Sequence, residues 1–259
     1  MSSTREEREV PAPNRFLIVC AARTGSTLLR LKLQSHPDVC CHGEIMTPDP
    51  KRALQITGMH PQHKSNLRAL VLDTRREDPA RFLRDFALYP GGFRAVGAKI
   101  KYAELTPEVI GNAHAWVLAN KDLKIIHLKR QNLLRRLVSH ELAVQSGVNM
   151  VLEGGPVPEY KSLQLDFEAC TRDFDAVRAE EERSAALFAD HPVIDVTYER
   201  VADPSSGECE RILDFLGVPH APLHTPMVKL GRDDLSESVG NYDELRRQAQ
   251  GTRYAHYFD

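Results

Sequence analysis

Five consecutive residues near the start of the chain, Arg23-Thr24-Gly25-Ser26-Thr27, combine side chains that suit the binding of an anion. Arginine carries a permanent positive charge, and serine and threonine supply hydroxyl donors. Glycine lacks a Cβ, so its backbone can come close to a ligand. The run therefore predicts an anion site to which Arg23 supplies the charge.

The elements that must position this run are a strand before it and a helix after it. Residues 16–21 are an unbroken apolar stretch, typical of a central parallel strand, and a leucine-rich stretch to about residue 35 indicates a helix. The first N–H groups of such a helix have no partners, and its dipole favours negative charge. A simpler alternative is that Thr24 or Ser26 only caps the helix.

The run does not fit the loop of an ATPase or GTPase. The Walker pattern places a lysine directly before the hydroxyl residue, whereas Gly25 precedes Ser26 here. We therefore do not expect ATP or GTP hydrolysis.

A second basic position follows a second apolar strand. Residues 123–128 predict a buried strand, and Arg130 and Asn132 come after it, before an amphipathic helix. A guanidinium can bind a phosphate with two parallel hydrogen bonds, and Ser139 lies over two turns further along the helix. Taken alone, the segment is also compatible with a solvated basic face made of Lys129, Arg130, Arg135 and Arg136.

Together these segments resemble the sulfotransferases that use 3′-phosphoadenosine 5′-phosphosulfate (PAPS). Arg23-Thr24-Gly25-Ser26-Thr27 is similar to their 5′-phosphosulfate loop. Arg130-Gln131-Asn132 is similar to their R-x-N segment, which holds the 3′-phosphate together with a serine of the next helix. The Arg130-to-Ser139 spacing looks more like the bacterial branch that acts on carbohydrates and lipopolysaccharides.

Two later segments extend the resemblance, which runs from about residue 15 to the end of the chain. Val196-Thr197-Tyr198-Glu199 and Leu213-Asp214-Phe215-Leu216-Gly217 resemble the family's Y-E-D-L and F-L-G segments, and Asn241-Tyr242-Asp243-Glu244-Leu245 resembles the tail of the bacterial branch. The loops over 45–92 and 148–166 match no such pattern, and we expect acceptor specificity there.

The resemblance implies roles for the residues that it matches. We expect no metal, because basic residues and N–H groups can carry the charge. Arg23 would stabilise the leaving oxygens, and Tyr198 would contact adenine, although a buried tyrosine at a strand end is nearly as good an interpretation. Lys229 and Arg232, which lie outside the matched segments, are candidates to close over the nucleotide from the tail. The 5′-phosphosulfate would be held by Thr24, Gly25, Ser26 and Thr27. The 3′-phosphate would be held by Arg130 and Ser139.

The general base is the least determined part of the predicted site. The catalytic histidine of the cytosolic enzymes has no counterpart in the strand predicted over 93–102. We choose Glu44, which follows a short strand predicted over 39–42 as a G-E pair does in bacterial carbohydrate sulfotransferases. His42 is the main rival, because an imidazole titrates near neutral pH. Lys99, with Lys101 on the same face of its strand, is expected to reach the sulfuryl group or to lie on a solvated edge.

Predicted strands alternate with predicted helices, which implies an α/β fold with an open, mostly parallel sheet. We expect a mobile lead-in over residues 1–14 and a single domain over 15–259, with an irregular lid over 148–165. Ligands of such sheets bind beyond the carboxyl ends of the strands, where all these motifs fall. A further strand is predicted over 192–197. Further helices are predicted over 65–74, 78–88, 167–189, 209–216 and 241–249. One more helix opens at Thr106, and the amphipathic helix after Asn132 continues to Gly147.

Composition limits the class of protein. The chain has 259 residues with a net charge of −2, so general nucleic-acid binding is not expected. Its five cysteines lack C-x-x-C spacing, which argues against a disulfide framework or a zinc site and for a reducing compartment. No apolar run approaches the ~20 residues of a membrane span, so we expect a cytoplasmic protein.

The expected function is transfer of a sulfuryl group from PAPS to a hydroxyl of a sugar or glycolipid. One alternative is sulfation of a small aliphatic or aromatic alcohol. A second alternative, of a different class, is a non-catalytic protein that binds PAPS or its desulfated product, 3′-phosphoadenosine 5′-phosphate (PAP). The sequence leaves the oligomeric state open.

Overall fold

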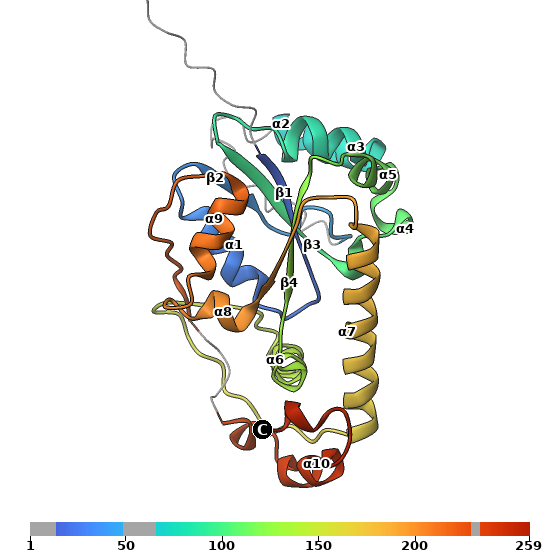
Figure 1. The fold of residues 1–259 in the computed structure, drawn as a ribbon, viewed down its shortest axis with the longest axis vertical. Helices are drawn as coiled ribbons and strands as arrows, with labels where there is room; N and C mark the ends of the chain where they lie inside the picture. The colour runs from blue at the N-terminus through green and yellow to red at the C-terminus, as the bar shows by residue number, and fades with distance from the viewer. Residues whose placement is uncertain (1–13, 49–65, 229–233) are drawn as a thin grey trace, which may run out of the picture.

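The computed structural model describes residues 14–48, 66–228 and 234–259, and Figure 1 shows a sheet with helices on both faces. The sheet has five strands, all parallel, in the order β2-β3-β1-β4-β6. In chain order these are β1 (Asn14–Cys20), β2 (Val39–His42), β3 (Ala95–Lys101), β4 (Lys124–Lys129) and β6 (Val193–Thr197). The predicted α/β class with an open, mostly parallel sheet is confirmed.

The central strand is β1, whose apolar run is buried on both sides. From residue 16 to residue 20 successive side chains enter alternate layers of core, and each is at most 2% exposed. Its neighbours are in register, so that Cys20 lies beside Lys101 of β3 and Leu128 of β4. The carboxyl ends of these three strands therefore meet at one edge of the sheet.

One face of the sheet is covered by α1 (Ser26–Gln34), α8 (Tyr198–Ala202) and α9 (Glu208–Leu216) (Figure 1). Leucines of α1 and α9 pack with the even-numbered residues of β1 in one buried cluster. Lys32 of α1 donates a hydrogen bond of 2.6 Å to the Val201 carbonyl, which fixes α1 against α8.

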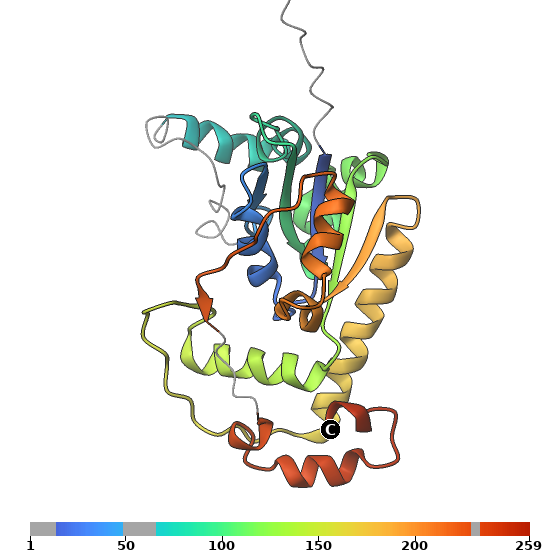
Figure 2. The same cartoon turned by 60° about the vertical axis from the view of Figure 1, so that its left-hand side comes forward.

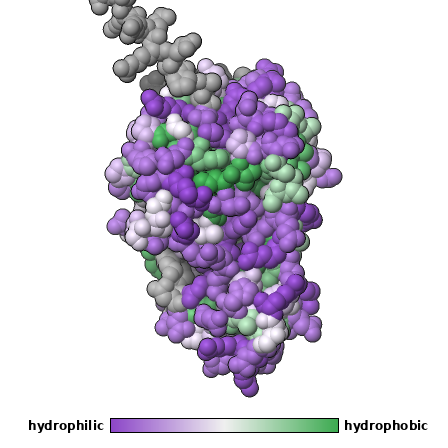
Figure 3. All heavy atoms as spheres, in the orientation of Figure 1, coloured by the Kyte–Doolittle hydropathy of each residue, from purple (hydrophilic) through white to green (hydrophobic). Residues whose placement is uncertain are grey.

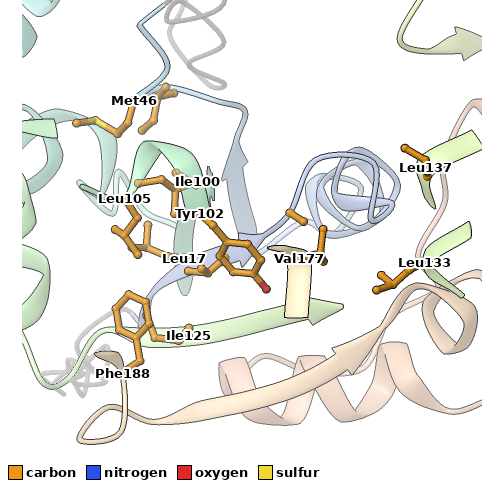
Figure 4. Close-up of a cluster of buried hydrophobic side chains, with 14 of the residues drawn as sticks. Leu17, Met46, Ile100, Tyr102, Leu105, Ile125, Leu133, Leu137, Val177 and Phe188 are labelled. Carbon is orange, nitrogen blue, oxygen red and sulfur yellow. The ribbon is translucent and has the colours of Figure 1, made fainter. Parts of the chain in front are cut away.

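The opposite face holds the larger core. It is covered by α2 (Asn66–Glu77), α3 (Pro79–Phe82), the π-helix η2 (Leu83–Ala87), α4 (Pro107–Ile110), α5 (Asn112–Ala119) and α7 (Phe167–Leu187). Figure 4 shows Leu17 and Ile125 of the sheet in this core, with Leu105 and Phe188 from the covering layer. The surface in Figure 3 is mostly hydrophilic, with apolar side chains gathered in a strip across its upper half.

A second group of elements lies beyond the carboxyl edge of the sheet, in the lower half of Figure 2. It includes α6 (Leu133–Ser146), which extends below α1, and α10 (Tyr242–Ala249). The shorter members are β5 (Val151–Leu152), β7 (Met227–Val228) and the 3-10 segments η4 (Leu235–Glu237) and η5 (Ala255–Tyr257). A further 3-10 segment, η3 (Tyr102–Glu104), directly follows β3 and packs through Tyr102 into the larger core. In the part of the chain that the structure describes, no helix has a long enough apolar stretch to cross a membrane.

Local structure departs from the sequence-based expectations in three places. The lid predicted as irregular over 148–165 contains β5, which pairs antiparallel with β7 from over 70 positions further along the chain. The helix predicted over 78–88 becomes a π-helix after Phe82. The helix opening at Thr106 ends at Ile110, because Gly111 leaves the helical region with φ 53° and a new helix starts after it.

Candidate active site

The first loop that the sequence predicts to bind an anion follows β1 with an unusual backbone. Arg23 has φ 65° and Gly25 has φ 80°, both in the left-handed region. For arginine this conformation costs about 1 to 2 kcal/mol, so the surrounding contacts must hold it. α1 begins at Ser26 with Gly25 as its N-cap, and no side chain of the described residues caps it. The first amides of α1 thus open toward the space beyond β1.

Thr24 and Ser26 do not cap α1, so that simpler alternative is wrong. The Thr24 hydroxyl donates to the Ala21 carbonyl at 2.9 Å, and this side chain is fully buried beneath the loop. Thr24 therefore fixes the shape of the loop, and only its backbone is left for a ligand. Ser26 and Thr27 are the hydroxyl residues of the loop that line the adjacent cavity.

Gly25 is required by its contact with an aromatic ring. A Cβ placed on Gly25 would lie 2.2 Å from Cδ2 of Tyr198, which is far inside the van der Waals distance. Arg130 also contacts this ring, because its guanidinium lies over the Tyr198 ring at 4.5 Å from the centroid. Gly25, Tyr198 and Arg130 thus form one packed group that joins the two loops.

The second predicted loop is held by hydrogen bonds from its backbone amides to an acid. The Glu199 carboxylate, at the start of α8, accepts from the amides of Gln131 at 3.1 Å and Asn132 at 3.4 Å. Asn132 in turn caps α6 by accepting from the Arg135 amide at 2.9 Å. The loop that carries Arg130 therefore has a fixed shape at the start of α6.

Arg130 is enclosed within this loop. Its Nη1 donates to the Arg23 carbonyl at 3.1 Å, while its buried Nε has no hydrogen-bond partner among the described residues. Burial lowers the pKa of Arg130, and the nearby Tyr198 and Glu199 oppose that shift. The solvated basic face is not what the structure shows, because Arg136 is 4% exposed and pairs with Asp173 of α7.

The Arg23 side chain connects the first loop to α6. Arg23 donates to the Ser139 hydroxyl of α6 through Nε at 3.1 Å and Nη2 at 3.0 Å. Its Nη1 donates to the Asn149 carbonyl at 2.8 Å, just before β5. Burial lowers the pKa of Arg23. Arg23 and Ser139, separated by 116 positions in the sequence, therefore contribute to one site.

The acid predicted as the base lies between two lysines of β3. Glu44 Oε1 is 2.7 Å from Lys99 Nζ, and its Oε2 is 2.9 Å from Lys101 Nζ. Lys99 also donates to the Thr27 hydroxyl at 3.3 Å, and Lys101 pairs with Glu104 at 3.0 Å. Burial by itself would raise the pKa of Glu44, but Lys99 and then Lys101 outweigh it and lower that pKa to about 2.

The segment after Glu44 is anchored from α2. Arg75 donates through Nε to the Ile45 carbonyl at 2.8 Å and through Nη2 to the Thr47 carbonyl. Because Ile45 directly follows Glu44 and Thr47 lies three residues after it, Arg75 helps to fix the position of the carboxylate.

His42, the rival base, lies away from this group. Its side chain is 3% exposed and is not among the described residues that line the cavity. Burial lowers the pKa of His42 to about 4, a hydrogen bond at Ala87 opposes the shift, and Arg30 adds to it. Lys229 and Arg232 lie outside the described residues.

A cavity of about 960 Å³ brings the two loops and the acid together. The predicted site residues on its wall are Arg23, Gly25, Ser26, Thr27, Glu44, Lys99, Arg130, Ser139 and Tyr198. Pockets that bind small molecules usually measure about 300 to 1,000 Å³, so this one is large enough for a nucleotide. In residues 14–48, 66–228 and 234–259 no group of three or more histidine, cysteine, aspartate or glutamate side chains is arranged to hold a metal ion.

Sequence reasoning missed several residues of this wall. Arg30 of α1 and Arg135 of α6 add two further cations, and Tyr160 comes from the region that was expected to be an irregular lid. For Arg30 a signal existed, because it lies three residues after Thr27 and so shares a face of α1 with it. The loop that carries Tyr160 had no periodicity from which its position could be inferred.

Comparisons with known proteins show the family of this chain. The family model described as "Sulfotransferase family" matches residues 14–222. "Nodulation protein H" of Rhizobium meliloti (strain 1021) is 25% identical over 95% of this chain and 96% of its own length. "Nodulation protein H" of Rhizobium tropici is 27% identical over 96% and 95%.

Among solved structures, a sulfotransferase from Alicyclobacillus acidocaldarius shares the fold, with a TM-score of 0.51 and 19% identity over 95% of this chain and 93% of that one. The family model covers most of the chain, including both predicted loops and the acid between the lysines. The chain is therefore an enzyme of the sulfotransferase family, as the two loops predicted.

Proposed function

We propose that this enzyme transfers the sulfuryl group of PAPS to a hydroxyl of a carbohydrate or glycolipid. The observation that supports the proposal is the hydrogen bond from Arg130 to the Arg23 carbonyl, which joins the two loops; both loops line one cavity together with Ser139 and Glu44. A donor with two separate anionic groups and an acceptor with a hydroxyl would use all three parts of that wall.

The residues present suit such a donor. Ser26, Thr27 and the first amides of α1 would hold the 5′-phosphosulfate, because a helix N-terminus favours an anion. The buried Nε of Arg130, which has no partner among the described residues, is a donor that a 3′-phosphate would satisfy, and Ser139 would add a hydroxyl. Tyr198 would offer its ring to the nucleotide between these two groups.

The reaction needs one proton to move. The acceptor oxygen forms a bond to sulfur while the bond between sulfur and the 5′-phosphate oxygen breaks, which releases PAP. The acceptor proton passes to the Glu44 carboxylate. Arg23 and Lys99 would stabilise the negative charge on the leaving oxygen and the sulfuryl group, as cations do in related transfers.

The contact with Lys99 would make Glu44 an effective base only after the donor has bound. With a pKa of about 2, Glu44 is a weak base while Lys99 holds it. Lys99 also contacts Thr27 of the loop that would bind the phosphosulfate. An anion at that loop competes for the Lys99 ammonium, so the Glu44 pKa is expected to rise when the donor is bound.

The acceptor end of the cavity suits a molecule with both polar and apolar parts. Beside its charged residues the wall includes Val148, Met150, Met227 and Val228, from the two strands β5 and β7 and their surroundings. The resemblance to the bacterial carbohydrate branch favours a sugar or glycolipid over a small alcohol. We also propose a cytoplasmic location, which the five free thiols support.

The test is acceptor-dependent release of PAP. Purified protein is incubated with PAPS and a panel of sugars, glycolipids and small alcohols, and both products are quantified by mass spectrometry. We expect PAP and a sulfate ester in equal amounts, only when an acceptor is present. Arg23→Ala should lower turnover by about 100- to 1,000-fold. PAP release that is independent of every acceptor would refute the proposal.

A further inference from the structure

Some of the basic side chains on the cavity wall have no hydrogen-bond or ion-pair partner among the described residues. Six arginine and lysine side chains lie on its wall, namely Arg23, Arg30, Lys99, Lys101, Arg130 and Arg135. Four of them have partners described above. The guanidinium groups of Arg30 and Arg135 make no hydrogen bond or ion pair with any residue that the structure describes. Glu44 is the one acidic residue among the described residues of the wall.

The two unpaired arginines lie on different elements. Arg135 is in the first turn of α6 and close enough to Arg130 for their charges to repel. It therefore lies at the end of the cavity assigned to the 3′-phosphate. The negative charges of the bound donor would pair with Arg135, Arg23 and Arg130.

Arg30 lies toward the acid instead. One turn further along α1, Gln34 accepts a 2.9 Å hydrogen bond from the Cys41 amide, so this side of α1 faces β2. The charge of Arg30 also acts on His42 at the end of β2. Glu44 follows two residues later and lies on the same cavity wall. Tyr198 and α8, on the nucleotide side, pack against the other side of α1, where Lys32 donates to Val201.

We propose that Arg30 binds an anionic group of the acceptor, so that the enzyme selects a hydroxyl compound that also carries a carboxylate or a phosphate. The inference rests on the proposed function, whose acceptor it narrows to an acidic class. Arginine is suited to this task because its planar guanidinium donates two parallel hydrogen bonds to either group. In a partly enclosed cavity with one carboxylate already paired, an acceptor anion would offset the remaining positive charge.

The experiment compares acceptors in matched triads. Each triad holds the neutral methyl glycoside of one sugar, its 1-phosphate and its uronic acid, so that the carboxylate and the phosphate are tested separately. Sulfuryl transfer from PAPS is measured as kcat/KM for each member. We expect at least one charged member to exceed its neutral counterpart by tenfold or more.

Variants then assign that preference to one side chain. Arg30→Ala should remove the preference with little change for the neutral acceptor, and Arg30→Lys should restore part of it. Arg81→Ala is the matched control, because Arg81 is an exposed arginine of α3 whose partner is Asp85, away from the cavity. Affinity for PAP, measured by calorimetry, should be the same in all four proteins.

Several results would overturn the inference without touching the proposed function. One is that neutral and charged acceptors have the same kcat/KM in every triad. Another is that the preference for charged acceptors persists in Arg30→Ala. A third is that Arg30→Ala lowers kcat/KM equally for neutral and charged acceptors. The last result would place Arg30 on the sulfuryl group. If no acceptor is sulfated, the proposed function fails. Binding of the charged sugars to the PAP-loaded protein and to its Arg30→Ala variant then decides the anion site, and equal binding by both would overturn it.

Discussion

Glu44 is the residue on which the chemistry depends most, because it is the acid of the described cavity wall and two lysines contact it. Glu44→Gln keeps the shape of the side chain but removes the basic site. We expect turnover to fall by more than tenfold while PAP affinity stays nearly unchanged. A variant that keeps more than about a tenth of wild-type turnover has lost less than about 1.4 kcal/mol from the barrier, and the base then lies elsewhere.

Glu104 provides the control for that experiment. It pairs with Lys101 at 3.0 Å, as Glu44 does at 2.9 Å, but it is not among the described residues of the cavity wall. Glu104→Gln should therefore perturb the same lysine and keep most of the turnover. If both variants lose turnover equally, the loss comes from the disturbed lysines and not from a missing base.

Glu44 should also make stability depend on pH. Its pKa in the folded protein, about 2, lies below the ordinary value of 4.5, so its ion pairs stabilise the fold above about pH 5 and lose that effect as the pH falls toward 2. The contribution is on the order of 3 kcal/mol. The Tm of Glu44→Gln should lie several degrees below that of the wild type at pH 7, and the gap should narrow by pH 3. A gap that stays constant over this range would show that the carboxylate is not held by the lysines.

At the scale of elements, the turn between β1 and α1 joins backbone geometry to ligand binding. Gly25→Ala would place a methyl group 2.2 Å from the Tyr198 ring and strain a φ of 80°. We expect Tyr198 and Arg130 to be displaced and PAP affinity to fall by about tenfold or more, measured by calorimetry.

Gly207→Ala is a control that separates the backbone strain of Gly25→Ala from its steric clash with Tyr198. Gly207 is the N-cap of α9 and has φ 67°, but its added Cβ would meet nothing within 4 Å. It should cost about 1 kcal/mol of stability and leave PAP affinity unchanged. An unchanged affinity in Gly25→Ala as well would mean that the Tyr198 contact does not shape the site.

The sequence predicts those elements whose own residues carry a recognisable hydrophobic pattern. The apolar runs of β1 and β4 and the leucines of α1 carry their own periodicity, and the structure has these elements within about two residues of the predicted bounds. β5 and β7 have only two residues each, and their pairing joins distant segments, so neither had a signal. The split of the helix after Phe82 into a π-helix likewise has no local cause that we can identify.

At the scale of the whole molecule, the parallel sheet explains why the site could be predicted in part. Strands that end at one edge bring Arg23, Lys99 and Arg130 together, whatever their separation in the sequence. The partners of these side chains were not predictable, because they depend on three-dimensional contacts. Examples are the bond of the Thr24 hydroxyl to Ala21 and the Glu199 carboxylate that holds the Arg130 loop.

The central claim is that the two loops form a single site for a donor with a 3′-phosphate. The most direct measurement is calorimetry of PAP against AMP, which differ in that phosphate. The wild type should bind PAP at least about tenfold more tightly than AMP, since a charged hydrogen bond contributes roughly 1.5 to 3 kcal/mol. Arg130→Ala should abolish the difference. Equal affinities for PAP and AMP in the unmutated protein would contradict the assignment of the second loop.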